Sequence, residues 1–343
     1  MQYTQLGHSD LKVSKICLGT MTWGEQNSQA EAFEQLDKSL AYGVNFIDTA
    51  ELYPLPPNAN TYSKTETIIG HWLAERSSRD KIVLATKIAG SGLQYIRGGS
   101  RFNKRHLFDA VDQSLARLQT DYIDLYQLHW PERDTNFFGK LSYSHSETDL
   151  STPIAETLEA CHELVKAGKI RYLGISNETP WGMMTYLNLA EKHNWPRIVS
   201  IQNPYNLLNR SFEIGLSEIA CRENCGLLAY SPLAFGVLTG KYHAGKMPES
   251  SRLQLFPSYS RYKNTLSDML TQQYVDIAME HGLTPTQLAL AYVNSRNFLT
   301  STIVGATTLA QLEENILSIN VELDTEALKA IEGVHSTHPN PCP

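Results

Sequence analysis

Short apolar segments alternate with longer segments of helical periodicity from residue 16 towards the end of the chain. The short segments are mostly continuous apolar runs, a pattern typical of parallel strands whose outer face is covered by helices. The predicted strands are Ile16–Leu18, Asn45–Asp48, Ile82–Lys87, Ile123–His129, Ile170–Ser176, Ile198–Gln202, Leu227–Ser231 and Thr302–Val304.

The segments between these strands have apolar faces of helical spacing. Leu107, Val111, Leu115 and Leu118, for example, fall on one side of a helix. Capping boxes are predicted where Ser or Thr is followed three positions later by Glu or Gln, because the two side chains can satisfy free amide groups at a helix start. The predicted boxes are Ser63–Glu66, Thr284–Gln287 and Thr308–Gln311.

Eight βα units without a break in composition favour an α/β fold with one closed (β/α)8 TIM barrel. We expect one domain over residues 1–343, with a β-hairpin at 2–13 that closes the lower end, the barrel at 16–318, and a C-terminal helix and tail at 324–343. The alternative is a doubly wound open sheet. Such a sheet would usually bring a glycine-rich first turn if it bound a dinucleotide, and the GTMTWG segment does not match GxGxxG.

Three predicted connections are longer than a barrel needs: Pro54–Ser63, Pro131–Pro153 and Pro232–Ser267. Each follows the carboxyl end of a predicted strand. In a barrel those ends share one face, and active sites lie there. Long connections in a compact domain are usually functional or disordered, so we expect these loops to surround a site.

Composition narrows the class of protein. Hydrophobic residues make up 42% and charged residues 19%, as in soluble globular proteins. No apolar run approaches the ~20 residues of a membrane-spanning helix, and the first residues lack a secretory signal, so no membrane contact and a cytoplasmic location are expected. A net charge of −7 argues against a general nucleic-acid binder, which needs a basic face.

The cysteines do not suggest a disulfide framework, because they are five in number and widely scattered. Cys221 and Cys225 have helical spacing that could place two metal ligands together. No further His or Cys cluster stands nearby to complete a coordination shell, so we interpret them as small buried or partly buried thiols and expect no metal.

Polar side chains with compatible chemistry end several predicted strands. Asp48, Lys87 and His129 end three of them, and Tyr53 follows Asp48 closely. One such residue alone is more often a solvated or satisfied core group. Barrel geometry directs all of these ends to one rim, which makes a shared site the simpler interpretation.

This set suits proton donation to a carbonyl oxygen during hydride transfer. A free tyrosine has a pKa of about 10, and a neighbouring ammonium stabilises the phenolate and lowers that pKa. Asp48 would keep Lys87 charged and oriented beside Tyr53. His129 could donate a hydrogen bond to the same substrate oxygen.

Ordered motifs over roughly residues 16 to 315 resemble the aldo-keto reductase family, and most closely its bacterial Tas-type branch, with potassium-channel β subunits as more distant relatives. The motifs are GVNFIDTAELY, TETIIGHWL, ATK, DYIDLYQLHWP, GKIRYLGISN, IQNPYNLLNR, AYSPLAFGVLTGKY and VGATTLAQLEEN. The resemblance implies a catalytic tetrad of Asp48, Tyr53, Lys87 and His129. In the channel branch the histidine position often differs, so its presence here favours an active reductase.

The resemblance also implies that NADPH/NADP+ binds in an extended pose without a Rossmann fold. The phosphate-site cations favour NADPH over NADH. The matching positions are Thr20, Met21, Ser176, Asn177 and Gln202 beside the nicotinamide, Tyr230 stacked on it, Ser231, Pro232, Leu233 and Gly236 over the pyrophosphate, Lys241, Arg252, Gly305, Thr307 and Gln311 at the adenosine phosphate, and Glu314 and Asn315 at the adenine.

The chain departs from its relatives after Tyr53, where a glycine is common in the family and the segment PLPPNANTYS stands here. Trp23, Leu55 and Trp130, with the loop Pro131–Pro153, are predicted to shape the substrate pocket. For the two tryptophans, packing at the barrel rim is an equally good interpretation, since rim aromatics serve both purposes.

The leading hypothesis is therefore an NADPH-dependent reductase of small-molecule aldehydes or ketones. The alternative is a cofactor-binding redox sensor or interaction subunit in which slow turnover is incidental, as the channel β subunits suggest. A metal-dependent hydrolase has little support, because His129 lacks partners at metal-ligand spacing. The sequence does not determine the substrate, the reaction direction or the oligomeric state.

Overall fold

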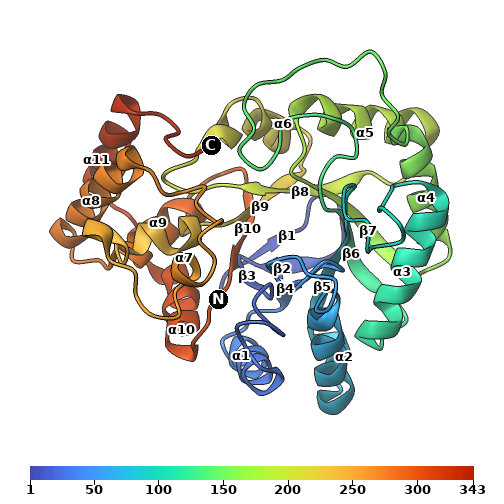
Figure 1. Ribbon diagram of the computed structural model, residues 1–343, viewed down its shortest axis with the longest axis horizontal. Coiled ribbons are helices and arrows are strands. Elements are labelled where there is room, and N and C mark those ends of the chain that lie inside the picture. The colour runs from blue at the N-terminus through green and yellow to red at the C-terminus, as the bar shows by residue number, and fades with distance from the viewer.

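The computed structural model describes residues 1–343, and its central feature is a closed barrel of eight parallel strands (Figure 1). The barrel closes because β10 pairs with β3, with Thr302 opposite Ile16. The (β/α)8 prediction is confirmed, and the open-sheet alternative is wrong. The barrel strands are β3 (Ile16–Gly19), β4 (Phe46–Asp48), β5 (Val83–Ile88), β6 (Ile123–Leu128), β7 (Ile170–Ser176), β8 (Ile198–Pro204), β9 (Gly226–Tyr230) and β10 (Leu299–Val304).

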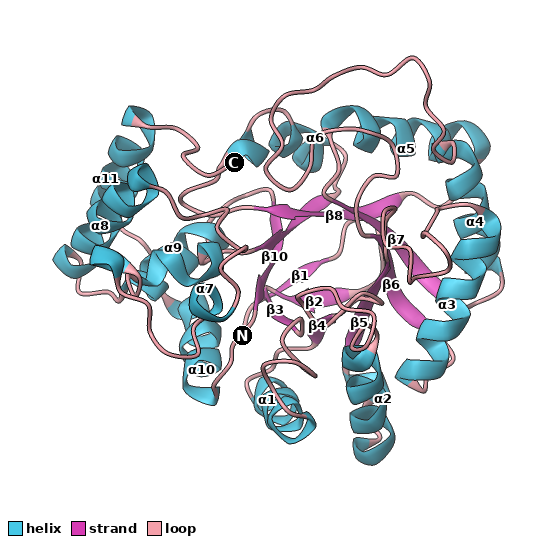
Figure 2. Cartoon of the chain, viewed as in Figure 1, coloured by secondary structure: helices cyan, strands magenta, loops and turns pink.

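Helices surround the strands on the outside (Figure 2). The α-helices are α1 (Gln29–Ala41), α2 (Lys64–Arg76), α3 (Lys104–Leu118), α4 (Ile154–Lys166), α5 (Pro180–His193), α6 (Leu216–Arg222), α7 (Arg252–Leu255), α8 (Thr265–Glu280), α9 (Pro285–Asn294), α10 (Leu309–Leu317) and α11 (Thr325–Thr337). Short 3-10 helices are η1 (Arg79–Lys81), η2 (Ser211–Glu213), η3 (Ala234–Thr239), η4 (His243–Gly245) and η5 (Ser318–Asn320).

An N-terminal hairpin closes one end of the barrel, as predicted. Its strands are β1 (Tyr3–Gln5) and β2 (Lys12–Ser14), which pair antiparallel. Leu6, Leu11 and Val13 are buried with side chains that fill the barrel interior. Removing these apolar side chains from water stabilises the closed end.

The predicted capping boxes have three different outcomes. The box at Thr284 is complete, and Thr308 accepts a bond from the Gln311 N–H while the Gln311 side chain bonds Thr307 instead of Thr308. The box at Ser63 is wrong. Ser63 adopts a left-handed conformation with φ of 70° and makes no side-chain cap, because its hydroxyl donates to the Glu51 carbonyl.

The carboxyl ends of the strands open onto one rim, and the predicted long connections start there. The connection after β6 contains no helix or strand between residues 131 and 153, whereas the connection after β9 contains η3, η4 and α7. Residues 89–103, after β5, form a further long loop that the sequence pattern did not single out. These segments enclose the space above the barrel.

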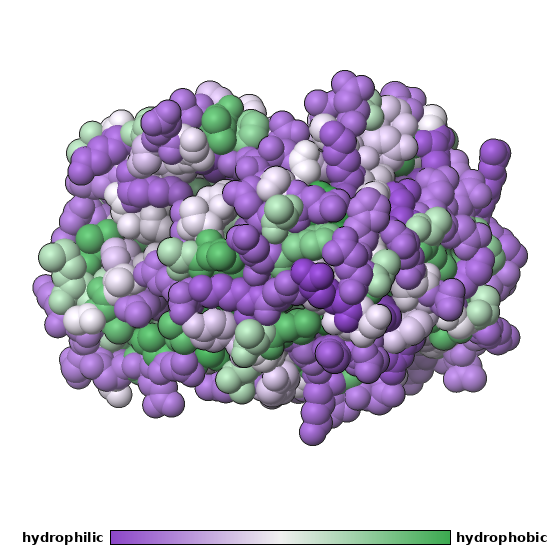
Figure 3. All heavy atoms as spheres, turned by 90° about the horizontal axis from the view of Figure 1, so that it is seen from below, coloured by the Kyte–Doolittle hydropathy of each residue, from purple (hydrophilic) through white to green (hydrophobic).

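The outer surface is mixed in polarity. On the face drawn in Figure 3, apolar residues appear in separate groups among hydrophilic ones. No helix has both the length and the apolar character that crossing a membrane requires.

Candidate active site

The structure brings Asp48, Tyr53, Lys87 and His129 together at the carboxyl ends of β4, β5 and β6. The Lys87 ammonium lies between three oxygens: Nζ is 2.6 Å from Asp48 Oδ2, 2.8 Å from the Thr49 carbonyl and 3.4 Å from the Tyr53 hydroxyl. The Tyr53 and His129 rings meet edge to face, with centroids 5.7 Å apart. Lys87 is fully buried behind Tyr53, so only the other three reach the cleft.

Two glutamines hold the Asp48 carboxylate in place. Its Oδ1 accepts from Gln127 Nε2 at 3.0 Å and from Gln202 Nε2 at 2.9 Å, leaving Oδ2 for Lys87. Gln202 Nε2 also donates to Gln127 Oε1 at 3.0 Å. The carbonyl oxygen Oε1 of Gln202 is therefore the free group of the Gln202 amide. Gln127 lies within the DYIDLYQLHWP motif, but no pattern along the chain assigned it a role.

Burial decides the protonation of the tyrosine. Desolvation raises the pKa of Tyr53 above 10, and the opposing effect of the Lys87 ammonium is smaller. The predicted lowering of this pKa is therefore wrong for the protein without bound ligands, because the amount of burial cannot be known from the sequence. Burial also works to lower the pKa of Lys87, but Asp48 and Tyr53 together raise it above 10.5. Near neutral pH, Tyr53 is protonated and Lys87 is charged.

His129 is neutral in this environment. Burial, and then the nearby Lys87 charge, lower the pKa of His129 well below 6.5. Its Nδ1 is buried and has no hydrogen-bond partner. A neutral imidazole has one N–H group, which can donate a hydrogen bond without adding a positive charge beside Tyr53.

One large cleft of about 950 Å³ opens at this rim and extends to α10. Every residue that the sequence assigned to the cofactor lines it. These are Thr20, Met21, Ser176, Asn177, Gln202, Tyr230, Ser231, Pro232, Leu233, Gly236, Lys241, Arg252, Gly305, Thr307, Gln311, Glu314 and Asn315.

Hydrogen bonds fix the floor of the cleft beside the tetrad. Tyr230 donates through its hydroxyl to Asn177 Oδ1 at 2.6 Å, and Asn177 Nδ2 donates to the His129 carbonyl at 2.9 Å. Ser176 donates to the Gln202 carbonyl at 2.8 Å. The aromatic ring of Tyr230 is thereby held as a flat surface of the cleft.

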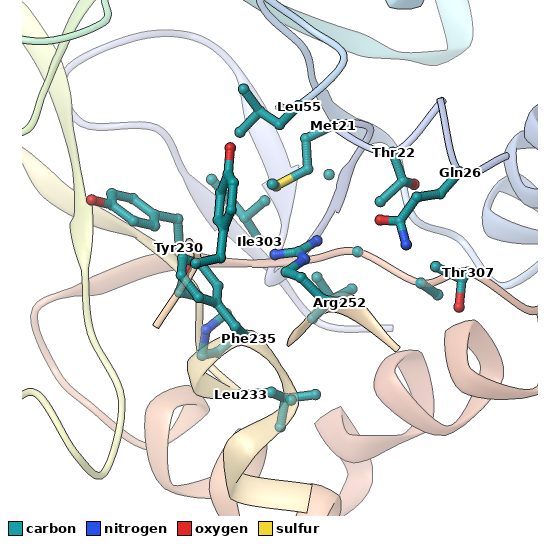
Figure 4. Close-up of a pocket in the computed structure, with 18 of the residues that line it drawn as sticks. Met21, Thr22, Gln26, Leu55, Tyr230, Leu233, Phe235, Arg252, Ile303 and Thr307 are labelled. Carbon is teal, nitrogen blue, oxygen red and sulfur yellow. The ribbon is translucent and has the colours of Figure 1, made fainter. Parts of the chain in front are cut away.

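Three cations line the cleft, and none has a carboxylate side chain as its partner. One of them, Arg261, donates to the Pro343 carbonyl at 3.0 Å. Lys241 and Arg252 form no ion pair, in a protein whose other buried or half-buried arginines are mostly paired. Figure 4 shows the Arg252 side chain reaching into the cavity between Met21 and Phe235, and its guanidinium carbon lies 5.2 Å from the Phe235 ring centre. Burial lowers the pKa of Arg252. A bound anion would stabilise the charged guanidinium and offset this effect of burial.

The remote end of the cleft is formed by tight backbone and by a helix start. Gly236 has φ of 90°, a conformation that favours glycine, and a Cβ there would lie 2.8 Å from Lys241 Cε, so any other residue would make this lysine shift. Thr307 and Thr308 precede α10, whose free N–H groups and dipole favour negative charge. Size, cations and helix start together fit an elongated phosphate-containing molecule.

The predicted substrate residues divide into two groups. Leu55 and Trp130 line the cleft, and the Trp130 indole donates to the Ser91 carbonyl at 3.3 Å. Trp23 does not reach it, and its placement in the substrate pocket is wrong. Its side chain is fully buried in the main core and donates to Gln35 Oε1 at 3.2 Å, so rim packing is the correct interpretation.

The sequence interpretation did not identify a buried network of hydrogen-bonded side chains next to the tetrad. Glu51, within the ELY motif, pairs with Arg97, and Ser100 bonds Arg97 as well. The partners are 46 positions apart in the chain. No local pattern could have connected them, although a carboxylate between apolar residues was a signal that it is paired.

Comparison with known proteins agrees with this site. The model of the Aldo/keto reductase family matches residues 15–336. The chain belongs to this family. Protein tas of Escherichia coli strain K12 is 50% identical over 346 residues, covering 100% of both chains.

More distant relatives of this aldo/keto reductase have differing descriptions. A probable voltage-gated potassium channel subunit beta of Arabidopsis thaliana is 33% identical, covering 94% of this chain and 92% of its own. An L-glyceraldehyde 3-phosphate reductase of E. coli O157:H7 is 32% identical, covering 97% and 92%. Family membership makes the protein an oxidoreductase of the carbonyl-reducing kind, and the predicted family is confirmed.

Proposed function

We propose that this aldo/keto reductase reduces aldehydes or ketones to alcohols with NADPH, and that Tyr53 donates the proton. The observation that carries the proposal is the buried Lys87 ammonium held between Asp48 Oδ2 and the Tyr53 hydroxyl, where Tyr53 lines a cleft that also contains unpaired cations. A buried tyrosine does not ionise spontaneously at neutral pH, so it keeps its proton until a developing alkoxide accepts it.

Each residue of the tetrad has a role that follows from its position. Tyr53 gives its hydroxyl proton to the carbonyl oxygen, and Lys87 stabilises the phenolate that remains. The Asp48 carboxylate lies against the Lys87 ammonium and helps to keep it charged. His129, neutral and on the other side of Tyr53, donates a hydrogen bond to the same substrate oxygen.

The residues of the cleft fit NADPH. Tyr230 would offer a ring for the nicotinamide, and Ser176, Asn177 and the free Oε1 of Gln202 would lie near its amide. Lys241 and Arg252 would hold the phosphate groups, with the start of α10 at the adenosine end. When bound, the cofactor supplies the hydride for the carbonyl carbon.

The sensor or interaction subunit remains the second candidate, and the likeness to the plant channel subunit is the observation that favours it. Both candidates bind NADPH, so binding alone does not separate them. Turnover does.

A panel of small aldehydes and ketones mixed with the protein and excess NADPH, and in parallel with NADH, tests the proposal. We expect repeated turnover of at least one carbonyl with NADPH, followed as loss of reduced-nicotinamide absorbance. Turnover limited to one equivalent per protein across the whole panel would favour the sensor.

A further inference from the structure

A buried ion pair joins the turn that carries Tyr53 to the loop that follows β5. Glu51 lies two residues before Tyr53 and has 0% of its side chain exposed, and its partner Arg97 has 9%. Both guanidinium Nη atoms donate to the carboxylate, Nη2 at 2.9 Å from Oε2. The pair therefore links two separate loops at the rim of the barrel.

Glu51 is bonded to the end of β5 at Lys87 and to Ala89, the residue that follows the strand. Its N–H donates to the Lys87 carbonyl at 3.1 Å, and its Oε2 accepts from the Ala89 N–H at 3.0 Å. Its own carbonyl accepts from the Ser63 hydroxyl at 3.1 Å. Every polar group of this residue is thus used, and two of these bonds hold the turn against the end of the strand that carries Lys87.

Arg97 anchors the facing loop. Its Nη2 donates to Ser100 Oγ at 2.9 Å, and Ser100 donates to the Ala89 carbonyl at 2.5 Å. The neighbouring Ile96 is buried in the same small apolar cluster as Leu52, the residue directly before Tyr53. Loosening the ion pair would therefore free both loops around the tyrosine.

Such a pair is a poor device for stability alone. Burying two charges costs desolvation free energy that their attraction offsets only with full hydrogen bonding. Arg97 Nε is buried without a partner, which adds to the cost. The pair instead fixes the position of the turn that carries Tyr53. The site depends on that position, because the distance of 3.4 Å from Lys87 Nζ to the Tyr53 hydroxyl is already at the long end of a hydrogen bond.

We infer that Glu51 and Arg97 are positioning residues that hold the Tyr53 turn against β5 so that its hydroxyl stays within reach of Lys87. The inference rests on the proposed function, because the role concerns proton donation by Tyr53. Glu51 does not line the cleft, so it acts through the tyrosine and not on a ligand.

The test compares Glu51→Gln, Arg97→Met and the double variant with the wild-type protein. We expect kcat to fall about tenfold or more in each single variant, since small misplacements of a reacting group are costly, while the NADPH dissociation constant changes less than about twofold. The double variant should lose no more than the worse single variant, because both substitutions break one contact.

A second buried pair provides the matched control. Glu66 has 0% side-chain exposure, pairs with Arg117, and accepts from Thr86 Oγ at 2.5 Å, so it also touches β5 but on the helix side of the barrel. Glu66→Gln should lower the thermal midpoint comparably and leave kcat within about 1.5-fold, because it disturbs no contact of Tyr53.

The outcomes distinguish the positioning role of Glu51 and Arg97 from the proposed reductase function. Equal kcat loss in Glu51→Gln and Glu66→Gln, or unchanged kcat in Glu51→Gln, would overturn the positioning role while the wild-type activity still supports the reductase. Absence of wild-type turnover would overturn both. If Glu51→Gln does not fold, Ser100→Ala removes one bond to Arg97 and should lower kcat about threefold, and no change there would equally contradict the inference.

Discussion

The Lys87 ammonium lies 2.6 Å from Asp48 Oδ2, and neither side chain is more than 2% exposed. Asp48→Asn leaves that ammonium without a counter-ion, so we expect a loss of about 3–5 kcal/mol in the free energy of unfolding at neutral pH and a large fall in kcat. Denaturant unfolding and steady-state kinetics measure the two effects.

Asp37 provides the control for this substitution. It pairs with Arg76 at the surface, where both side chains are more than 40% exposed. Asp37→Asn should change stability by less than about 1 kcal/mol. Burial works to lower the folded-state pKa of Lys87, but Asp48 and Tyr53 raise it above 10.5. The stabilisation by the Asp48–Lys87 pair is therefore present at neutral pH and is lost as the pH rises above 10.5 through that folded-state pKa. The destabilisation caused by Asp48→Asn should fade over the same range. An equal, small effect of both substitutions would argue against a buried charge pair.

The unpaired cations should set cofactor affinity. Lys241→Ala and Arg252→Ala each remove a charge from the cleft, so we expect the NADPH dissociation constant to rise about 10- to 100-fold, and that of NADH to rise less. Lys246→Ala is the control, because Lys246 is exposed near Lys241 and does not line the cleft. Fluorescence titration checks the prediction, which is contradicted if all three variants bind NADPH as the wild type does.

His129 should contribute a measurable pH dependence of stability. Burial and then Lys87 lower its folded-state pKa well below 6.5, so the unfolded chain binds a proton that the folded protein does not, and stability falls as pH drops below 6.5. Replacing His129 with Asn should remove up to about 1.4 kcal/mol per pH unit from the slope of unfolding free energy between about pH 5 and about pH 6. An unchanged slope would show that His129 titrates normally in the folded protein.

Gly90 should be necessary for the position of Trp130, which lines the substrate end of the cleft. A Cβ at this position would lie 2.2 Å from the Trp130 indole, so Gly90→Ala must displace that ring or the strand end. We expect a loss of about 1–3 kcal/mol in stability and a raised KM for bulky carbonyls.

Gly333 is the matched control for Gly90, since it lies within α11 with no atom within 4 Å of an added Cβ. Gly333→Ala should stabilise the protein by about 0.5–1 kcal/mol. If Gly90→Ala were equally harmless, Trp130 would have to be more mobile than its contacts indicate.

The strands and the four-residue cluster could be predicted because both depend on patterns along the chain. Continuous apolar runs mark the barrel strands, and barrel closure brings the residues at their carboxyl ends to one rim. The position of Asp48 at the end of an apolar strand therefore indicates a place at the rim from the sequence alone.

What the sequence did not predict depends on neighbours distant in the chain. Ser63 fits a capping pattern, but its conformation is set by the turn at Glu51, and Glu66 is used by Arg117. The direction of the pKa shift of Tyr53 depends on burial, which only the folded chain determines. The placement of Trp23 likewise depends on how α1 packs, since Gln35 on that helix accepts its N–H.

The central claim is that Tyr53 donates the proton, and Tyr53→Phe tests it most directly. The substitution removes one hydroxyl at a position 8% exposed and leaves the ring in place. With a carbonyl that the wild type reduces repeatedly, we expect kcat to fall at least about 1000-fold while the NADPH dissociation constant stays within about twofold, since the hydroxyl acts only in the transition state. A Tyr53→Phe variant that binds NADPH normally and turns over at the wild-type rate would contradict the account.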